Sequence, residues 1–282
     1  MEIIKTVARL QDVVKDAREK GKTIGLVPTM GALHAGHRSL VERARRENDV
    51  VIVSVFVNPT QFNNPDDLRT YPRTAEADAA MLDACGVDFA FMPSVEEIYP
   101  EPDTRVFDLG PVAEVMEGAM RPGHFNGVAQ IVSKLFAYAR PTRAYFGEKD
   151  FQQIAVIRRM VQLEGFRDLT IVDCPIVRES DGLALSSRNV RLTPEGRKVA
   201  PEIRKALVDS LALKAEGRTP AEVKAAVTAR IDAVPGLRTE YYEIVDALTM
   251  QPVASWAEAV NGAVGCVTVF DGDVRLIDNI RY

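Results

Sequence analysis

The stretch KTIGLVPTMGALHAGHRSLVERARRENDVVIVSVFV, residues 22–57, decides the fold of the chain. Its first part, Lys22–Thr29, is an apolar run that reads as a short strand. The part His37–Asn48 reads as a helix with a charged outer face. The last part, Val50–Val57, is a continuous β-branched run, typical of a strand that a parallel sheet buries on both faces. The stretch therefore predicts a strand, a helix and a second strand of one parallel sheet.

The same alternation of strands and helices continues to about residue 175. Helices are expected at Val7–Lys20, Ala75–Gly86, Gly127–Pro141 and Asp150–Gly165, and strands at Asp88–Pro93, Arg143–Gly147 and Leu169–Pro175. Strands separated by helices of this length predict a doubly wound, Rossmann-like parallel α/β sheet. We assign this domain to residues 1–176.

After residue 176 the pattern changes to that of a smaller α+β domain, residues 177–282. Two helical stretches each open on a Thr-Pro pair, at Thr193 and at Thr219, where the threonine caps the helix and the proline enters its first turn. Three strand-like runs follow at 239–247, 263–270 and 273–280, and the Asp-Gly pair between the last two indicates a tight hairpin. An antiparallel sheet is expected here.

Composition excludes several classes of protein. The formal net charge is −5, which argues against a general nucleic-acid binder. The three cysteines are far apart and match no zinc spacing, so we expect reduced thiols. The N-terminus lacks the apolar core of a signal peptide, and no segment approaches the ~20 apolar residues of a membrane span. We expect a cytoplasmic protein without a membrane partner.

Two of the three histidines, His34 and His37, follow the first core strand. In a doubly wound sheet ligands bind at the carboxyl ends of the strands, and a helix N-terminus favours phosphate. Gly31 and Gly36 allow the backbone to approach a ligand closely. Because the histidines are three residues apart, they project from one face of the first helical turn. As an imidazolium, either of them can donate to phosphate oxygens.

Polar side chains also follow two other strands. Asn58 and Gln61 come after Val50–Val57, although Asn-Pro is also a common turn signal. Lys149 comes just beyond the strand Arg143–Gly147 as a point charge aimed into the crevice. Asp150 and Gln153 open the next helix, where Asp150 could act simply as a cap and Gln153 could simply face solvent.

The segment RESDGLALSSRN, residues 178–189, lies at the expected domain junction. Read alone it is a polar linker, but Ser186, Ser187 and Arg188 place small donors beside a guanidinium, a good phosphate clamp. Together with His34, His37 and Lys149 they form a cationic, donor-rich site that suits a nucleotide triphosphate. No Walker P-loop or GxGxxG motif is present, so the nucleotide site is of another kind.

Six ordered motifs resemble the pantoate–β-alanine ligase family within the HxGH nucleotidyltransferase superfamily. They are PTMGALHAGHRSL, FVNPTQF, DLRTYPRT, RPGHFNGV, FGEKDFQQ and RESDGLALSSRN. The resemblance implies that ATP activates (R)-pantoate as pantoyl adenylate, with release of pyrophosphate. It implies that β-alanine then displaces AMP to give pantothenate.

The resemblance also implies roles for individual residues. His37 would be the proton donor, while His34 and Lys149 would hold the phosphates of ATP. Gln61, Gln153 and Asn58 would bind pantoate, with Gln61 also near β-alanine. The residues expected to line the ATP site are Met30, Gly31, Ala32, Leu33, His34, Ala35, Gly36, His37, Gly147, Glu148, Lys149, Asp150, Val177, Leu185, Ser186, Ser187 and Arg188.

The resemblance further implies Mg²⁺ bound to the phosphates and a homodimeric enzyme. The family usually shows two adjacent acidic residues after YPRT, where this chain has Ala77 followed by Asp78. Asp78 is the acidic residue expected to contact the metal. Arg121 and His124 in RPGHF could lie near the site or serve a structural role.

Three alternatives stay open. A nucleotidylyltransferase would keep the nucleotide in its product and release only pyrophosphate. A tRNA-charging enzyme is less favoured because no basic RNA-binding domain follows the first domain. A non-catalytic nucleotide-binding module would bind ATP without turnover.

Overall fold

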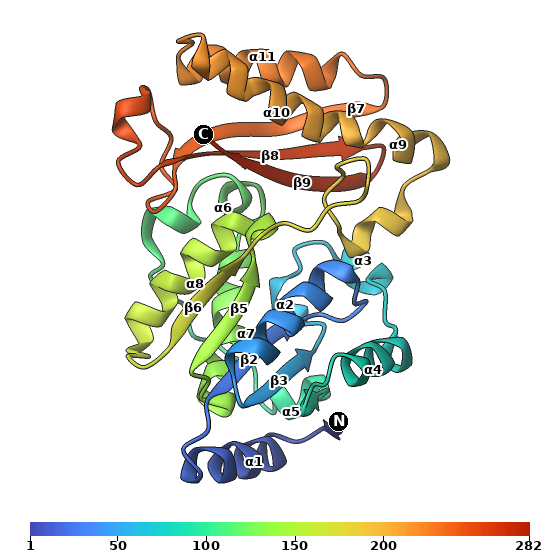
Figure 1. Ribbon diagram of the computed structural model, residues 1–282, viewed down its shortest axis with the longest axis vertical. Helices are drawn as coiled ribbons and strands as arrows, with labels where there is room; N and C mark the ends of the chain where they lie inside the picture. The colour runs from blue at the N-terminus through green and yellow to red at the C-terminus, as the bar shows by residue number, and fades with distance from the viewer.

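The computed structural model describes all 282 residues and contains two sheets (Figure 1). The larger sheet has six strands in the order β1-β4-β3-β2-β5-β6, and every neighbouring pair is parallel. Its strands are β1 (Glu2–Ile4), β2 (Ile24–Thr29), β3 (Val50–Val55), β4 (Phe89–Phe91), β5 (Arg143–Gly147) and β6 (Thr170–Cys174). The predicted parallel α/β sheet is confirmed.

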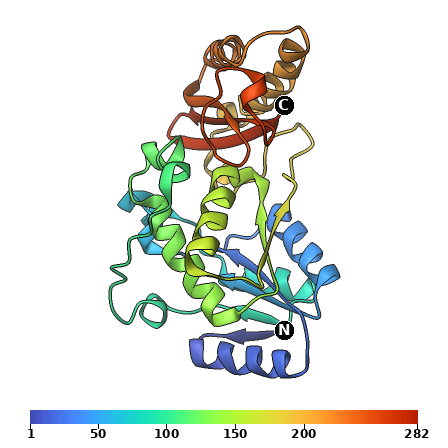
Figure 2. The ribbon, with the colours of Figure 1, turned by 90° about the vertical axis from the view of Figure 1, so that its left-hand side faces the viewer.

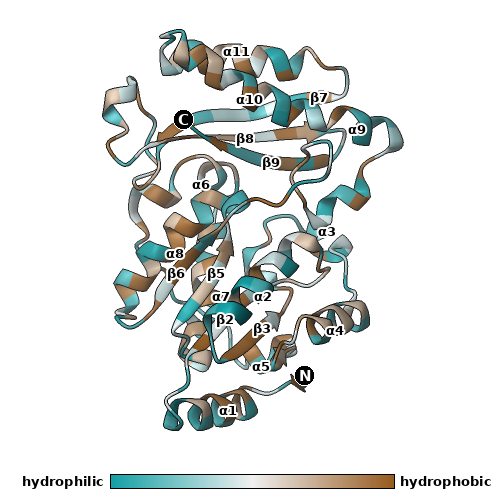
Figure 3. Ribbon diagram, in the orientation of Figure 1, coloured by the Kyte–Doolittle hydropathy of each residue, from teal (hydrophilic) through white to brown (hydrophobic).

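Helices cover both faces of this sheet. They are α1 (Val7–Glu19), α2 (Ala35–Glu47), α3 (Pro65–Thr70), α4 (Ala75–Ala84), α5 (Val95–Ile98), α6 (Glu117–Met120), α7 (His124–Ala139) and α8 (Phe151–Glu164). Three short 3₁₀ turns join them, η1 (Pro59–Gln61), η2 (Gly110–Ala113) and η3 (Glu148–Asp150). Hydrophobic residues gather on the central strands, whereas the outer face of α2 is hydrophilic (Figure 3).

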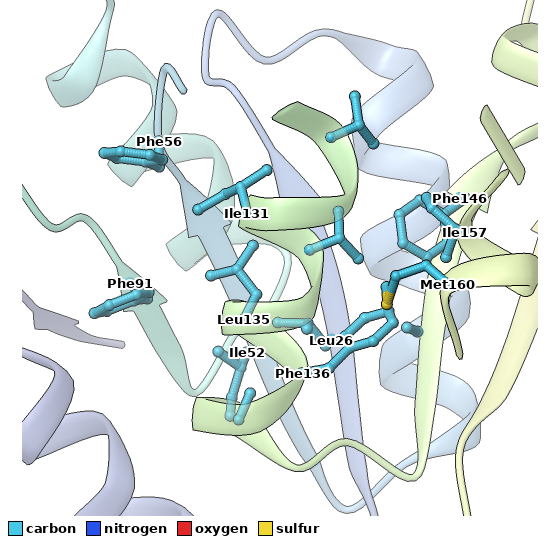
Figure 4. Packing of buried hydrophobic residues seen from close by; sticks show 14 of the residues in the cluster. Leu26, Ile52, Phe56, Phe91, Ile131, Leu135, Phe136, Phe146, Ile157 and Met160 are labelled. Atoms are coloured by element: carbon cyan, nitrogen blue, oxygen red, sulfur yellow. The ribbon is translucent and has the colours of Figure 1, made fainter. Parts of the chain in front are cut away.

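The β-branched run of β3 is buried on both sides, as its sequence predicts. Ile52 belongs to the core that α7 and α8 cover, in which Leu135 and Phe136 of α7 are also buried (Figure 4). Val51 and Val53 belong to the core that α2 and α4 cover on the opposite face. Successive side chains of a strand point to opposite faces, so one strand supplies both cores. This burial holds the carboxyl ends of β2, β3 and β5 at one edge of the sheet.

Strand β1 was not predicted from the sequence. It pairs in parallel with β4 at the edge of the sheet, with Ile3 opposite Ala90. A strand of three residues is too short to show a period of two in the sequence. Only Ile4 is buried, and two adjacent isoleucines show no alternation of apolar and polar residues.

The second sheet has three antiparallel strands in the order β7-β8-β9. They are β7 (Leu237–Asp246), β8 (Ala263–Asp271) and β9 (Val274–Arg281). Asp271 pairs with Val274, which leaves a two-residue turn in which Gly272 has a φ of +56°. The predicted hairpin is therefore confirmed, with its turn one residue later than the Asp-Gly pair suggests.

Three helices pack on one face of the antiparallel sheet, namely α9 (Pro194–Val199), α10 (Pro201–Ala215) and α11 (Pro220–Asp232). Thr193 and Thr219 cap α9 and α11, as predicted. The sequence pattern predicted a single helix where the structure has two consecutive helices, α9 and α10, and this prediction is wrong. The chain turns at Ala200 because Pro201 has no backbone N–H to continue the first helix.

The antiparallel sheet lies at the end of the molecule that the carboxyl ends of the parallel strands face (Figures 1 and 2). Its face opposite α10 and α11 contacts the parallel-sheet part through the carboxylate of Glu117. That carboxylate accepts hydrogen bonds from Tyr241 on β7, Thr268 on β8 and Arg275 on β9. The domain boundary at residues 176 and 177 stays a prediction. None of the helices is both long enough and apolar enough to cross a membrane.

Candidate active site

Two adjoining cavities open at the carboxyl ends of β2, β3 and β5. The first has a volume of about 220 Å³ and the second, beneath the antiparallel sheet, about 590 Å³. Lys149, Asp150, Gln153, Ser186 and Arg188 line both of them. Segments that are far apart in the sequence therefore meet at one place.

Most of the residues predicted for the site line the first cavity. These are Met30, His34, Gly36, His37, Asn58, Gln61, Gly147, Lys149, Asp150, Gln153, Val177, Leu185, Ser186, Ser187 and Arg188. The other predicted residues line neither cavity. Gly31, Ala32, Leu33, Ala35 and Glu148 lie next to this set along the chain, whereas Asp78 lies on α4. The site thus combines two histidines, two cations and three amide side chains with an apolar wall.

The turn between β2 and α2 is held by a buried carboxylate. Gly31 and Ala32 both have positive φ, of 82° and 49°, so the chain bends sharply after β2. Asp78, which is 2% exposed, accepts hydrogen bonds from the N–H groups of Ala32 (3.0 Å) and Leu33 (2.8 Å). Its carboxylate also accepts from the hydroxyl of Thr74 at 3.0 Å. Asp78 therefore stabilises the turn that carries both histidines.

This role bears on the predicted metal site. The carboxylate of Asp78 is enclosed by three hydrogen-bond donors, and the acidic, histidine and cysteine side chains form no group of three or more that could hold a metal ion. Asp78 therefore does not fit the expected contact with Mg²⁺. Oxygen ligands for a magnesium ion at this edge would come from a bound triphosphate and water.

The hydrogen bonds of the two histidines favour neutral rings, and their action as imidazolium donors to phosphate stays a prediction. The Nδ1 atom of His34 accepts from the N–H of Gly36 at 3.1 Å, and the Nδ1 atom of His37 accepts from the N–H of His34 at 3.3 Å. Each ring is therefore neutral, with its proton on Nε2. Burial and the charge of Lys149 lower the pKa of His34 to about 4. Burial, then His34 and Lys149, lower the pKa of His37 to about 3.

Hydrogen bonds within the turn also limit how the backbone N–H groups at the start of α2 can bind an anion. The N–H groups of Ala32 and Leu33 are engaged by Asp78, and those of His34 and Gly36 by the two imidazoles. These backbone donors cannot all turn to a phosphate. The imidazoles instead accept them on one side and offer Nε2–H on the other, so the rings extend the donor capacity of the helix start.

Positive charge comes from the lysine and the arginine of the site. The ammonium of Lys149 has one ionic partner, the carboxylate of Asp150 at 3.3 Å. The guanidinium of Arg188 pairs with Asp67 at 2.8 Å, and the hydroxyl of Tyr71 lies 3.3 Å from that of Ser187. Arg188 is therefore tied to helix α3, which carries Asp67.

The amide of Asn58 is used entirely within the protein. Its Nδ2 donates to Oε1 of Gln61 at 3.1 Å and to the carbonyl of Gly127 at 3.1 Å, while its Oδ1 accepts from the hydroxyl of Tyr99 at 2.8 Å and from that of Thr60 at 3.2 Å. Asn58 is only 1% exposed. It therefore orients Gln61, whose Oε1 is held in place and whose Nε2 donates to the sulfur of Met30 at 3.2 Å.

Arg121 and His124 hold the backbone of Gln61. Nδ1 of His124 lies 2.8 Å from the carbonyl of Gln61, and Nη1 of Arg121 lies 3.2 Å from Nε2 of His124. Because the guanidinium can only donate, His124 accepts at Nε2 and donates from Nδ1. Burial and the charge of Arg121 lower the pKa of His124 to about 4. Both side chains also line the larger cavity, so they lie near the site and hold its backbone.

Three kinds of residue at the site were not predicted from the sequence. Tyr99 orients Asn58, and Tyr71 and Asp67 contact the Ser187–Arg188 segment. The apolar wall of the first cavity comes from α7 through Val128, Ile131, Val132 and Leu135. The spacing of these apolar residues was visible in the sequence, but it equally describes a helix buried in a core.

Known proteins of one family are similar to this chain over nearly its whole length. The family model described as pantoate-beta-alanine ligase matches residues 2–281. The chain is 62% identical to pantothenate synthetase of Porphyromonas gingivalis strain W83, over 100% of this chain and 99% of the relative. It is 60% identical to pantothenate synthetase of Phocaeicola vulgatus, with the same coverage.

Two solved structures are similar over nearly their whole length. Pantothenate synthetase from Thermus thermophilus has a TM-score of 0.92 at 49% identity, covering 99% of both chains. Pantoate-beta-alanine ligase from Francisella tularensis, solved in complex with beta-gamma ATP and beta-alanine, has a TM-score of 0.81 at 36% identity, covering 100% of this chain and 97% of that one. The fold, the arrangement of the cavity residues and these matches lead to one conclusion: the chain belongs to the pantoate–β-alanine ligase family.

Proposed function

We propose that the chain ligates pantoate to β-alanine at the expense of ATP, through a pantoyl adenylate, and releases AMP and pyrophosphate. The observation that supports this most strongly is the convergence of two neutral imidazole donors, one ammonium and one guanidinium beside two amide side chains in adjoining cavities. The family to which the chain belongs performs this ligation, and the Francisella relative was solved with beta-gamma ATP and beta-alanine.

Adenylation is the step in which charge decides the rate. An oxygen of the pantoate carboxylate attacks the α-phosphorus of ATP, the bond from that phosphorus to the bridging oxygen breaks, and pyrophosphate leaves with the electron pair. An anion must approach a polyanion, and negative charge grows on the departing group. Lys149 and Arg188 supply fixed positive charge, and one preorganised donor of this kind contributes roughly 3 kcal/mol to lowering the barrier.

The histidines supply donors without requiring protonation at neutral pH. His34 and His37 offer Nε2–H groups whose rings are held in place by backbone hydrogen bonds. A bound triphosphate would raise their pKa, because its negative charge favours the imidazolium form. His37, the more deeply buried of the two, donates to a phosphate oxygen as charge builds, and His34 holds a neighbouring phosphate with Lys149.

The amide side chains and the apolar wall suit the acyl substrate. Gln61 and Gln153 can hydrogen-bond the hydroxyl and carboxylate groups of pantoate, while Ile131 and Val132 of α7 offer a surface to its methyl groups. Asn58, predicted to bind pantoate directly, is assigned an indirect part, because it orients Gln61. The amine of β-alanine then attacks the acyl carbon and loses a proton. The bond from that carbon to the AMP oxygen breaks, and AMP leaves.

Magnesium, the homodimer and the cytoplasmic location stay predictions. Any Mg²⁺ would accompany ATP, since the chain offers no three-residue acidic ligand set of its own. The antiparallel-sheet part is proposed as a cover of the site that excludes water from the reactive acyl adenylate.

The test is product analysis with purified protein, ATP, pantoate and β-alanine. The proposal expects pantothenate, AMP and pyrophosphate in equal amounts, and no pantothenate when any one substrate is omitted. A product that keeps the nucleotide would identify a nucleotidylyltransferase instead. ATP binding without any turnover would identify a non-catalytic module.

A further inference from the structure

The last strand of the chain contacts two of the segments that face the cavities. Asp278 and Asn279 are consecutive residues of β9, and both are 6% exposed. Successive side chains of a strand point to opposite faces, so one dipeptide can hold a different segment on each side. Both residues line the larger cavity together with Lys149 and Arg188.

Asn279 holds the turn that carries Lys149. Its Nδ2 donates to the carbonyl of Glu148 at 2.7 Å and to the carbonyl of Lys149 at 3.2 Å. Both acceptors are backbone atoms of η3, so the contact sets the path of the main chain from which the lysine side chain starts. The guanidinium of Arg281, two residues further along β9, pairs with the carboxylate of Glu148 at 2.6 Å but is 53% exposed.

Asp278 holds the start of the segment that leads to Arg188. Its two carboxylate oxygens receive both Nη atoms of Arg178, at 2.7 and 2.8 Å, which is the two-pronged geometry of a strong arginine–carboxylate pair. Arg178 also donates to the carbonyl of Gly182 at 3.1 Å and forms a backbone bridge with Ala184. The pair therefore closes the loop that immediately precedes the Ser186–Arg188 segment.

We infer that the Asp278–Asn279 dipeptide is a positioning element for adenylation, because it sets the Lys149 turn and the Ser186–Arg188 segment at their working separation. Neither residue touches the reacting atoms in this account. Each acts through the backbone or the guanidinium that it holds. The antiparallel sheet is then part of the machinery that aligns the triphosphate as well as a cover. This inference rests on the proposed function.

The experiment separates the two half-reactions. Adenylation is measured as pantoate-dependent exchange of labelled pyrophosphate into ATP, and the second step as single-turnover attack of β-alanine on preformed pantoyl adenylate. Asn279→Asp keeps the size of the side chain but turns a second oxygen toward the two carbonyls. Asp278→Asn keeps the size but weakens the pair with Arg178.

Both variants are expected to lower kcat of exchange at least tenfold, while the KM for pantoate and the second step stay within threefold of the unmodified protein. The two half-reactions are expected to respond differently because only adenylation requires the triphosphate to be aligned. A merely structural role would lower both half-reactions in parallel. Exchange within twofold of the unmodified protein, or a parallel fall of both steps, would overturn the inference.

Two controls complete the design. Asn261→Ala removes an amide that donates to the carboxylate of Asp246 at 3.1 Å. Asn261 belongs to the same part of the molecule but lines neither cavity. Arg281→Ala removes the exposed pair with Glu148; both controls are expected to stay within twofold in both steps. If Asn279→Asp does not fold, Asp278→Asn gives the same two readouts. Failure of the unmodified protein to exchange would instead refute the proposed function.

Discussion

The substitution Asp78→Asn distinguishes a residue that stabilises the histidine turn from a metal ligand. In the structure the carboxylate of Asp78 accepts from the N–H groups of Ala32 and Leu33 and from the hydroxyl of Thr74. An asparagine keeps one oxygen acceptor and turns an NH₂ group toward a donor. At least one buried N–H is then left without a partner.

The expected cost follows from these contacts. A hydrogen bond to a charged acceptor contributes about 1.5–3 kcal/mol, and an unpaired buried donor costs about 1–3 kcal/mol. We therefore expect Asp78→Asn to lower the free energy of unfolding by about 2–4 kcal/mol, a large part of the 5–15 kcal/mol that is typical of a whole protein. Adenylation should fall with it, since the same turn carries His34 and His37.

The assay is urea unfolding in buffer that contains a metal chelator. Asp83→Asn is the matched control, because Asp83 lies on the same helix, is 66% exposed and pairs only with the N-terminus. Its expected effect is below about 0.5 kcal/mol. If Asp78 were a metal ligand, Asp78→Asn would leave chelated stability unchanged and raise the Mg²⁺ concentration needed for half-maximal activity. That pair of results would refute our reasoning.

Further predictions concern pH, packing and charge. All three histidines are held neutral by a lowered pKa of about 3–4, so the unfolded chain binds more protons than the folded one between pH 6.5 and 5. The free energy of unfolding in urea should therefore fall, as the pH is lowered over that range, by on the order of 1–2 kcal/mol per histidine. A free energy that stays constant would contradict the assignment. In Gly127→Ala the new Cβ would meet the carbonyl oxygen of Thr60 at 2.4 Å. The free energy of unfolding in urea is therefore expected to fall by at least about 2 kcal/mol, and the KM for pantoate to rise. Unchanged values would show that the backbone moves to relieve the contact. Lys149→Met should lower pyrophosphate exchange at least tenfold, and the exposed Lys205→Met should not; equal rates in the two variants would remove Lys149 from the adenylation step.

The parallel sheet could be predicted from the sequence because its signals are local. Buried β-branched strands such as Val50–Val55 and amphipathic helices between them show their periods directly in the chain. The missed strand Glu2–Ile4 and the break at Ala200 depend on contacts or on one proline within an otherwise helical pattern. A strand of three residues is too short to show a period, and a single proline is outweighed by the helical pattern on both sides of it.

The sequence predicted which residues form the candidate site better than it predicted their charge and hydrogen bonds. Strand ends located His34, His37 and Lys149, because parallel strands end at one edge. The charge of the histidines could not be read from the sequence, since it depends on which backbone N–H each ring accepts and on burial. For the same reason the enclosed amide of Asn58 could not be told apart from one that faces a substrate.

The convergent donors and cations are proposed to activate pantoate by adenylation before β-alanine takes part. The most direct measurement is exchange of labelled pyrophosphate into ATP by the purified protein, with pantoate and β-alanine added separately. Exchange is expected with ATP and pantoate alone, and none is expected with ATP and β-alanine alone. Exchange that needs β-alanine, or that proceeds without pantoate, would contradict this mechanism.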